Sequence, residues 1–196
     1  MRTFRRCCLL VGLTLVAMEG AAAGSSAPDT VAGRTLAEWT ADLDSPNEIV
    51  QLRAAKTLQA FGPEAVPALV AALDSTTPGV RYWAASGLGD LGIKNNDALP
   101  KLRMMVKSNS VGLQIAAAYA LCRLGDIETG LPVLTAALRH PERGTANSAA
   151  DFLARIGPPA KDAVPALEEA TKHNDAHISK AALEALRRIR GVKPRF

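Results

Sequence analysis

The sequence predicts an all-α fold, a right-handed α-α superhelix of about five helical hairpins, on three observations. A motif of an apolar residue followed by proline recurs every 32 or 33 residues, a period typical of helical-repeat solenoids. Its prolines are Pro67, Pro100, Pro132 and Pro165. Leucines in the second half of each unit keep the same period, at Leu58, Leu88, Leu121, Leu153 and Leu186. The alternation of apolar and polar residues that marks strands extends nowhere beyond a few residues.

The first 23 residues have the features of a secretory signal peptide. MRTFRR is a basic start, residues 7–18 are an apolar run, and Ala21-Ala22-Ala23 offers a cleavage site. The run is shorter than the roughly 20 residues that span a bilayer. We therefore expect cleavage near Ala23 and export to a periplasmic or extracellular space, with no stable membrane insertion afterwards. An uncleaved membrane anchor is the alternative.

Cleavage would remove most of the excess positive charge. The chain has 23 Lys and Arg against 19 Asp and Glu, and the leader holds three arginines and one glutamate. The remaining 20 basic and 18 acidic residues leave a net charge of +2. A polyanion such as nucleic acid is therefore not an expected partner.

Five helical hairpins are expected between residues 36 and 190, after a linker at 24–35. Apolar spacing predicts helices at 36–43 and 48–61 for the first hairpin, and the others are expected at 64–92, 97–125, 128–157 and 161–190. The recurrent proline falls in the second position of each first helix, where its missing N–H costs little. Glycines end the second helices, at Gly62, Gly92, Gly125 and Gly157. Residues 191–196 form a C-terminal tail.

Two sets of residues are predicted to be buried between the helices. A column of alanines would let neighbouring helices approach closely; its members are Ala54, Ala84, Ala117, Ala149 and Ala182. Trp39 lies on the apolar side of the first helix, and we expect it to cover the N-terminal end of the stack.

The period, the proline, the paired alanines and the LxxLG ending resemble HEAT-like repeats of the PBS-lyase type over residues 36–190. That family mixes scaffolds with a few enzymes. Its members that resemble deoxyhypusine hydroxylase bind two irons through adjacent His-Glu pairs. Here none of His140, His173 and His177 is followed by Glu, so the resemblance carries no metal site over to this chain.

The remaining histidines and the cysteine do not form a catalytic pattern in the sequence. His173 and His177 lie four residues apart, but Asn174-Asp175 predicts a helix N-cap that separates them. Cys122 has no histidine in its repeat, and the mixed residues at equivalent positions predict a partly exposed thiol. We therefore predict a protein that is not an enzyme and has no cofactor. The alternative is an enzyme or enzyme accessory of the PBS-lyase or deoxyhypusine-hydroxylase type.

The second helices present one largely polar stripe with two aromatic residues, Trp83 and Tyr119, in its middle. Trp, Tyr and Arg dominate the binding energy of interfaces, so we interpret this stripe as a surface that binds another protein. The resemblance implies that it lines the concave side. The residues assigned to it are Trp83, Tyr119, Arg123, Arg155, Arg187 and Arg188. The sequence leaves open that Trp83 packs over Tyr82 or into the core and that the arginines form a solvated face.

Overall fold

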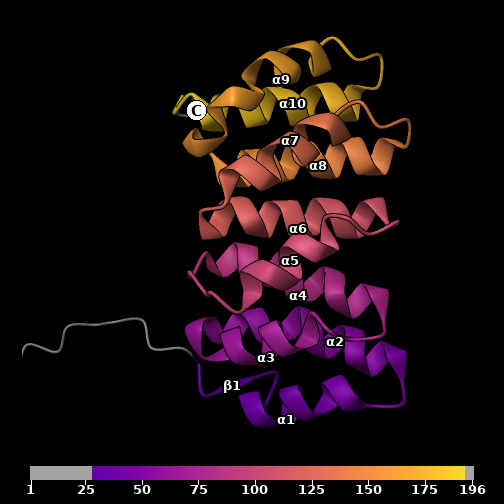
Figure 1. The fold of residues 1–196 in the computed structure, drawn as a ribbon, viewed down its shortest axis with the longest axis vertical. Helices are drawn as coiled ribbons and strands as arrows, with labels where there is room; N and C mark the ends of the chain where they lie inside the picture. The colour runs from indigo at the N-terminus through magenta and orange to yellow at the C-terminus, as the bar shows by residue number, and fades with distance from the viewer. Residues whose placement is uncertain (1–27, 193–196) are drawn as a thin grey trace, which may run out of the picture.

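The computed structural model describes residues 28–192, whose helices are stacked in sequence order along the long axis of the molecule (Figure 1). The hairpins are α1 (Leu36–Ala41) with α2 (Glu48–Leu58), α3 (Val66–Ala72) with α4 (Pro78–Leu91), α5 (Ala98–Met105) with α6 (Val111–Leu124), α7 (Ile127–Ala137) with α8 (Arg143–Ile156), and α9 (Val164–Ala170) with α10 (Ala176–Ile189). Short 3-10 helices occur at Asp42–Asp44, Gln59–Ala65 and Pro158–Ala163. Each second helix packs on the next one, from α2 through α4, α6 and α8 to α10. The predicted all-α superhelix of five hairpins is confirmed over the described part of the chain.

The recurrent proline has different positions in different first helices. Pro67 and Pro165 lie in the first turn of α3 and α9, as predicted. Pro132 instead lies inside α7, so the prediction for this repeat is wrong. The helix begins earlier because Asp126 caps it, with the Asp126 side chain accepting a hydrogen bond from the Thr129 N–H.

Glycines end α4, α6 and α8 as the sequence predicts, whereas α2 ends at Leu58 and Gly62 lies within the 3-10 segment Gln59–Ala65 that follows it. Gly92 and Gly125 have φ values of 62° and 104°, in the left-handed region where a side chain is disfavoured. The amide of Gly92 donates to the Leu88 carbonyl and thereby satisfies one of the last carbonyls of α4. Gly62 and Gly157 also have positive φ. The chain can thus reverse direction within a few residues and begin the next hairpin.

The core runs through all five hairpins between the first and second helices. Every member of the predicted alanine column is fully buried, and the repeated leucines are buried as well. Small side chains bring the second helices close together, and burial of the apolar side chains stabilises the stack because no hairpin covers its own apolar face alone.

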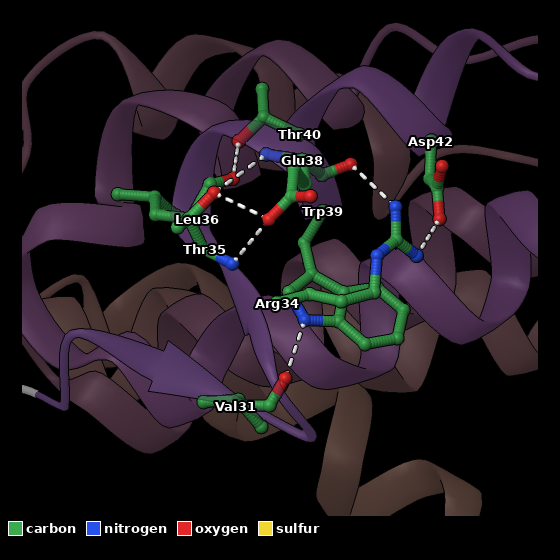
Figure 2. Close-up of polar contacts among 8 residues, drawn as sticks. All are labelled: Val31, Arg34, Thr35, Leu36, Glu38, Trp39, Thr40 and Asp42. Atoms are coloured by element: carbon green, nitrogen blue, oxygen red, sulfur yellow. Dashed lines mark hydrogen bonds and ion pairs between the residues drawn. The ribbon is translucent and has the colours of Figure 1, made fainter.

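The N-terminal end is closed by a small β-hairpin that the sequence analysis missed. β1 (Thr30–Val31) pairs antiparallel with β2 (Arg34–Thr35), so the predicted linker at 24–35 is wrong over these residues. Trp39 is buried at this end, as predicted, with 4% of its surface exposed. Figure 2 shows its indole N–H donating to the Val31 carbonyl at 3.0 Å, while the Arg34 guanidinium lies 4.5 Å from the ring centroid. Arg34 also pairs with Asp42 at 2.5 Å, which fixes the cover over Trp39.

The C-terminal end is closed by larger and charged side chains. In α8, Ala150 and Ala154 are buried, whereas 33 residues later α10 carries Leu183 and Arg187, both exposed. At these two positions α10 has larger side chains than α8, so its outer surface differs from the small apolar surface that α8 presents to α10.

Some predicted features lie outside the described residues. These are the signal peptide at 1–23, the first part of the linker and the last four residues of the tail. In residues 28–192, no helix is both long and apolar enough to cross a membrane.

Candidate functional site

The predicted interaction residues lie on one face of the stack, which we call the second-helix face; it comprises the solvent-side residues of α2, α4, α6, α8 and α10. The structure divides this face into three parts. A buried polar and aromatic network joins α4, α6 and α8, an exposed cluster lies on α2 and α4, and Arg187 and Arg188 are exposed on α10. The buried network does not offer its side chains to a partner.

Tyr119 belongs to the buried network, so its prediction as an exposed anchor is wrong. Only 1% of its surface is exposed, because its ring stacks on Phe152 of α8 at a centroid distance of 4.5 Å and an angle of 9°. A Cβ atom on Gly89 would lie 2.6 Å from the ring, so this glycine makes room for the tyrosine. The glycine within the α4 pattern was the sequence signal that a large side chain enters there.

Asp90 joins the polar groups of the network. Its Oδ1 accepts a hydrogen bond from the Tyr119 hydroxyl at 2.7 Å and pairs with the Arg155 guanidinium at 2.5 Å. Arg155 also lies over the Tyr119 ring, 5.2 Å from its centroid. Burial, and then the bond to Asp90, raise the pKa of the Tyr119 hydroxyl well above its ordinary value. Tyr119 is therefore a neutral donor at physiological pH.

Arg123 connects three helices and is half-buried. From α6 its Nε donates to the Gly89 carbonyl on α4 at 2.9 Å, and its Nη1 reaches the Arg155 carbonyl on α8 at 3.5 Å. The guanidinium thus satisfies carbonyls near the ends of two neighbouring helices. Arg123 and Arg155 hold the stack together and are not free anchors as predicted.

Trp83 is the aromatic residue of the prediction that remains partly exposed. Its ring packs edge to face against Tyr82, with centroids 5.4 Å apart, which is one of the arrangements that the sequence left open. The ammonium of Lys56, on α2, lies 5.0 Å from the indole centroid. Arg53, one turn before Lys56, is exposed. These three residues, Arg53, Lys56 and Trp83, are called the α2–α4 cluster below.

Arg187 and Arg188 lie on α10 at the far end of the face and are exposed. Both pair with Glu184, Arg188 at 2.8 Å and Arg187 at 4.0 Å. They are separated from Trp83 by α6 and α8, so the six assigned residues do not form one contiguous patch.

Cys122 is buried, with 5% of its surface exposed, so the prediction of a partly exposed thiol is wrong. Its position faces the following hairpin, where Gly130 of α7 lies so close that a Cβ there would be 2.6 Å from the sulfur. Burial, with a smaller contribution from the charge of Asp126, raises the pKa of the Cys122 thiol to about 12. A thiol that stays protonated is a poor nucleophile.

The histidines take part in the loops between helices. The Nδ1 atoms of His140 and His173 accept hydrogen bonds from the amides of Glu142 and Asp175, at 3.1 and 2.9 Å. Asp175 caps α10 as predicted, accepting from the His177 amide at 2.8 Å. In residues 28–192 no group of three or more His, Cys, Asp or Glu is arranged to hold a metal ion. The residues present therefore do not fit a di-iron centre built from His-Glu pairs.

Comparison with known proteins gives the relatives of this fold. A family model described as HEAT repeats matches residues 36–122 and 131–195, and a model described as PBS lyase HEAT-like repeat matches residues 113–140. No curated protein matches the chain.

Several solved structures are similar. The complex of CpcE and CpcF of phycocyanin lyase from Nostoc sp. PCC7120 matches with a TM-score of 0.58 and 25% identity, over 84% of this chain and 70% of that one. An engineered protein matches with a TM-score of 0.51 and 24% identity, over 80% and 79% of the two chains. A designed armadillo repeat protein in complex with the peptide (KR)4 matches with a TM-score of 0.51 and 20% identity, over 79% and 81%. The last two similarities concern the fold alone.

Proposed function

Because the chain belongs to the HEAT-repeat family, we propose that it is a non-catalytic scaffold that binds another protein through the second-helix face. The observation that carries this proposal is the α2–α4 cluster, where a half-buried tryptophan lies beside the exposed Lys56, and the exposed Arg53 lies three residues before Lys56 on the same helix. Tryptophan and arginine are enriched among residues that dominate interfaces. An extended stack of helices also offers a partner a long surface. The similarity to CpcE and CpcF, which form a complex with each other, also supports binding to another protein.

The non-catalytic part of the proposal is supported by how the reactive side chains are used. The Cys122 thiol is buried and kept protonated, and His140 and His173 each use a ring nitrogen to hold a loop amide. These groups serve packing and turn geometry, which leaves them poorly placed for attack or proton transfer.

The test of the binding surface is a capture experiment with paired variants. The wild-type protein, Trp83→Ala and Met104→Ala are each immobilised and exposed to an extract of the native source, and bound proteins are identified by mass spectrometry. Met104 is the matched control because it is 77% exposed and lies on α5, a first helix. We expect one partner that is retained by wild type and Met104→Ala and lost by Trp83→Ala. Trp83→Ala should melt at a lower temperature, because its half-buried ring packs on Tyr82, but circular dichroism should show it folded at the temperature of the capture experiment. Equal retention by all three proteins would contradict the proposal.

We also propose that the protein acts after export, in a periplasmic or extracellular space. The support is the basic and apolar leader followed by Ala21-Ala22-Ala23. Fractionation of the native cells and N-terminal sequencing of the protein test this. A mature chain that begins near residue 24 in the exported fraction is expected, and an intact N-terminus in the cytoplasm would rule export out.

A second candidate function is an enzyme or enzyme accessory of the lyase type. It is favoured by the similarity to phycocyanin lyase at 25% identity and by the PBS lyase HEAT-like repeat at residues 113–140. This candidate predicts that the purified protein binds a linear tetrapyrrole at one-to-one stoichiometry, measured by the change in the pigment's absorption spectrum. For the hydroxylase form of the alternative, elemental analysis would show stoichiometric iron, which the scaffold proposal does not expect.

A further inference from the structure

The positive charges on the second-helix face are compensated in some helices and not in others. Arg155 on α8 pairs with Asp90, and Arg187 and Arg188 on α10 pair with Glu184. Arg123 on α6 has no paired carboxylate within the described residues, but it is half-buried and its guanidinium faces two backbone carbonyls. These four arginines of α6, α8 and α10 are therefore occupied by groups of the protein itself, whereas Lys180 on α10 is exposed and has no carboxylate oxygen within 4.0 Å among residues 28–192.

Arg53 and Lys56 on α2 differ from these four arginines. Both are exposed, and neither has a carboxylate oxygen within 4.0 Å among residues 28–192. Asp42 is the acidic group whose charge interacts with Arg53, but its carboxylate is bound by Arg34 at 2.5 Å. The Lys56 ammonium instead lies over the face of the Trp83 ring, 5.0 Å from its centroid.

The α2–α4 cluster therefore combines two uncompensated cations with an exposed part of an indole ring. The cations lie three residues apart on one helix, so they are neighbours on its surface. An acidic peptide segment complements this arrangement, because its carboxylates can pair with Arg53 and Lys56 while an apolar side chain between them covers Trp83. Opposite charges of this kind set the choice of partner and speed up association.

We infer that the partner of this protein is held by an acidic segment that contains an apolar residue and docks on Arg53, Lys56 and Trp83. The inference rests on the proposed function, since it names the chemistry of the partner for the same surface. It restricts the expected partners to proteins with an acidic segment, and such a segment can be synthesised as a peptide and tested.

The test measures binding of a defined peptide to the purified protein. A fluorescein-labelled peptide of glutamates around a central leucine is titrated with the protein, and its anisotropy is compared with that of the same peptide with glutamine for glutamate. We expect binding of the glutamate peptide that weakens as salt is raised, and no measurable binding of the glutamine peptide. Lys56→Glu and Arg53→Glu should each weaken binding roughly tenfold, since charge reversal adds repulsion to a lost ion pair.

Lys107→Glu is the matched control. It makes the same change in residue type and net charge at an exposed position just after α5, away from the cluster. Its affinity should equal that of wild type. Equal weakening by Lys107→Glu and Lys56→Glu would show a non-specific effect of net charge and would overturn the inference. Circular dichroism of each variant verifies that the helices are intact.

The outcomes separate this inference from the function on which it rests. If capture of the native partner depends on Trp83 but the glutamate peptide does not bind, the acidic segment is wrong and the protein-binding surface stands. If neither depends on Trp83, both fail. An oligonucleotide, or vesicles of phosphatidylserine and phosphatidylcholine, that bind through Lys56 while the glutamate peptide does not would also overturn the inference in favour of a phosphate-bearing partner.

Discussion

At the residue scale, the Asp90 carboxylate is the group on which the middle of the stack depends. It accepts from the Tyr119 hydroxyl of α6 and pairs with the Arg155 guanidinium of α8, while Asp90 itself belongs to α4. The Asp90 side chain thus joins three successive second helices, next to the stacked rings of Tyr119 and Phe152. Loss of one donor leaves the carboxylate with the other, whereas loss of the tyrosine ring removes packing that nothing replaces.

The first prediction separates these two contributions. Tyr119→Phe should lower the free energy of unfolding by about 1.5–2 kcal/mol, toward the lower end of the value for a hydrogen bond to a charged group because Arg155 remains paired with Asp90. Tyr119→Ala should lower it by about 3–5 kcal/mol, because it removes a buried ring stacked on Phe152 and leaves a cavity. Urea denaturation followed by circular dichroism measures both values. Similar losses for the two variants would mean that the hydroxyl, and not the ring, provides the stabilisation.

The second prediction concerns Asp126 and pH. Burial acts to raise the pKa of this carboxyl, but hydrogen bonds from Arg103 and from Thr129 outweigh it and hold the pKa below its ordinary value of 3.8. A lowered pKa in the folded state means that the stabilisation is present above the unfolded value and is lost as pH falls through the folded one. Below about pH 3.8, wild type should therefore lose stability relative to Asp126→Asn, which keeps a capping oxygen but has no charge.

The expected size of this effect is about 0.5–1 kcal/mol, since the Arg103 side chain is half exposed and its charge is screened by solvent. Thermal melts of wild type and Asp126→Asn at pH 7 and pH 3 provide the comparison. A difference between the two proteins that stays constant with pH would contradict the ion pair with Arg103.

At the element scale, the close contact between α6 and α7 depends on a glycine. A Cβ atom on Gly130 would lie 2.4 Å from the Ala118 carbonyl oxygen and 2.6 Å from the Cys122 sulfur. Both atoms belong to α6, and the backbone oxygen cannot move without shifting that helix. The absence of a side chain at Gly130 therefore lets α7 pack closely against α6.

The third prediction follows from this contact. Gly130→Ala should destabilise the protein by about 1–3 kcal/mol through overpacking, although alanine favours helices more than glycine does. Gly112→Ala is the control within α6, where the added methyl group meets only the Ser110 Oγ at 3.9 Å. That change should be neutral or stabilise by up to about 1 kcal/mol. Chemical denaturation of both variants checks the signs, and two stabilising results would refute close packing at Gly130.

The order and type of the helices could be predicted because the same spacing of apolar residues occurs in the five repeats, and proline and glycine recur with it in most of them. Each repeat therefore predicts a pair of helices independently of the others. The first positions of the helices were less predictable: Asp126 starts α7 early, and this capping side chain has no counterpart in the other repeats. The N-terminal β-hairpin was missed because each of its strands is only two residues long, too short to show alternation.

The candidate site was predicted less well than the fold, for a physical reason. The position of a residue along a helix predicts the face on which its side chain lies. It does not predict whether long side chains from a neighbouring helix cover that side chain. Tyr119 lies on the predicted face, yet Phe152 stacks on its ring and Arg155 lies over it from the next repeat. Trp83 has no such cover, and its exposure depends on Tyr82 and Lys56 in the folded chain.

At the scale of the whole molecule, the inner hairpins depend on neighbours on both sides. The α8 surface that faces α10 includes buried Ala150 and Ala154, and α8 and α10 make one of the larger helix contacts in the described chain. A chain that ended at Gly157 would expose this small apolar surface to water. Apolar surface of this kind favours association with a second copy.

The fourth prediction tests that dependence. Truncation after Gly157 should produce a protein that melts at lower temperature and self-associates, seen by size-exclusion chromatography with light scattering. Adding Asn147→Lys and Ala154→Arg, which reproduce Lys180 and Arg187 one repeat earlier, should restore a monomer. A truncated chain that is monomeric without these two changes would show that α10 is not required as a cap.

The unlike closures of the two ends also restrict how such a molecule can grow. Val31 and Arg34 hold the indole of Trp39 at one end, and Leu183 and Arg187 replace small residues at the other, so neither end presents the small apolar surface by which the inner second helices contact one another. We therefore expect an added hairpin to pack best between inner hairpins, for example at the junction of Gly125 and Asp126, where both of its sides would meet small apolar surfaces.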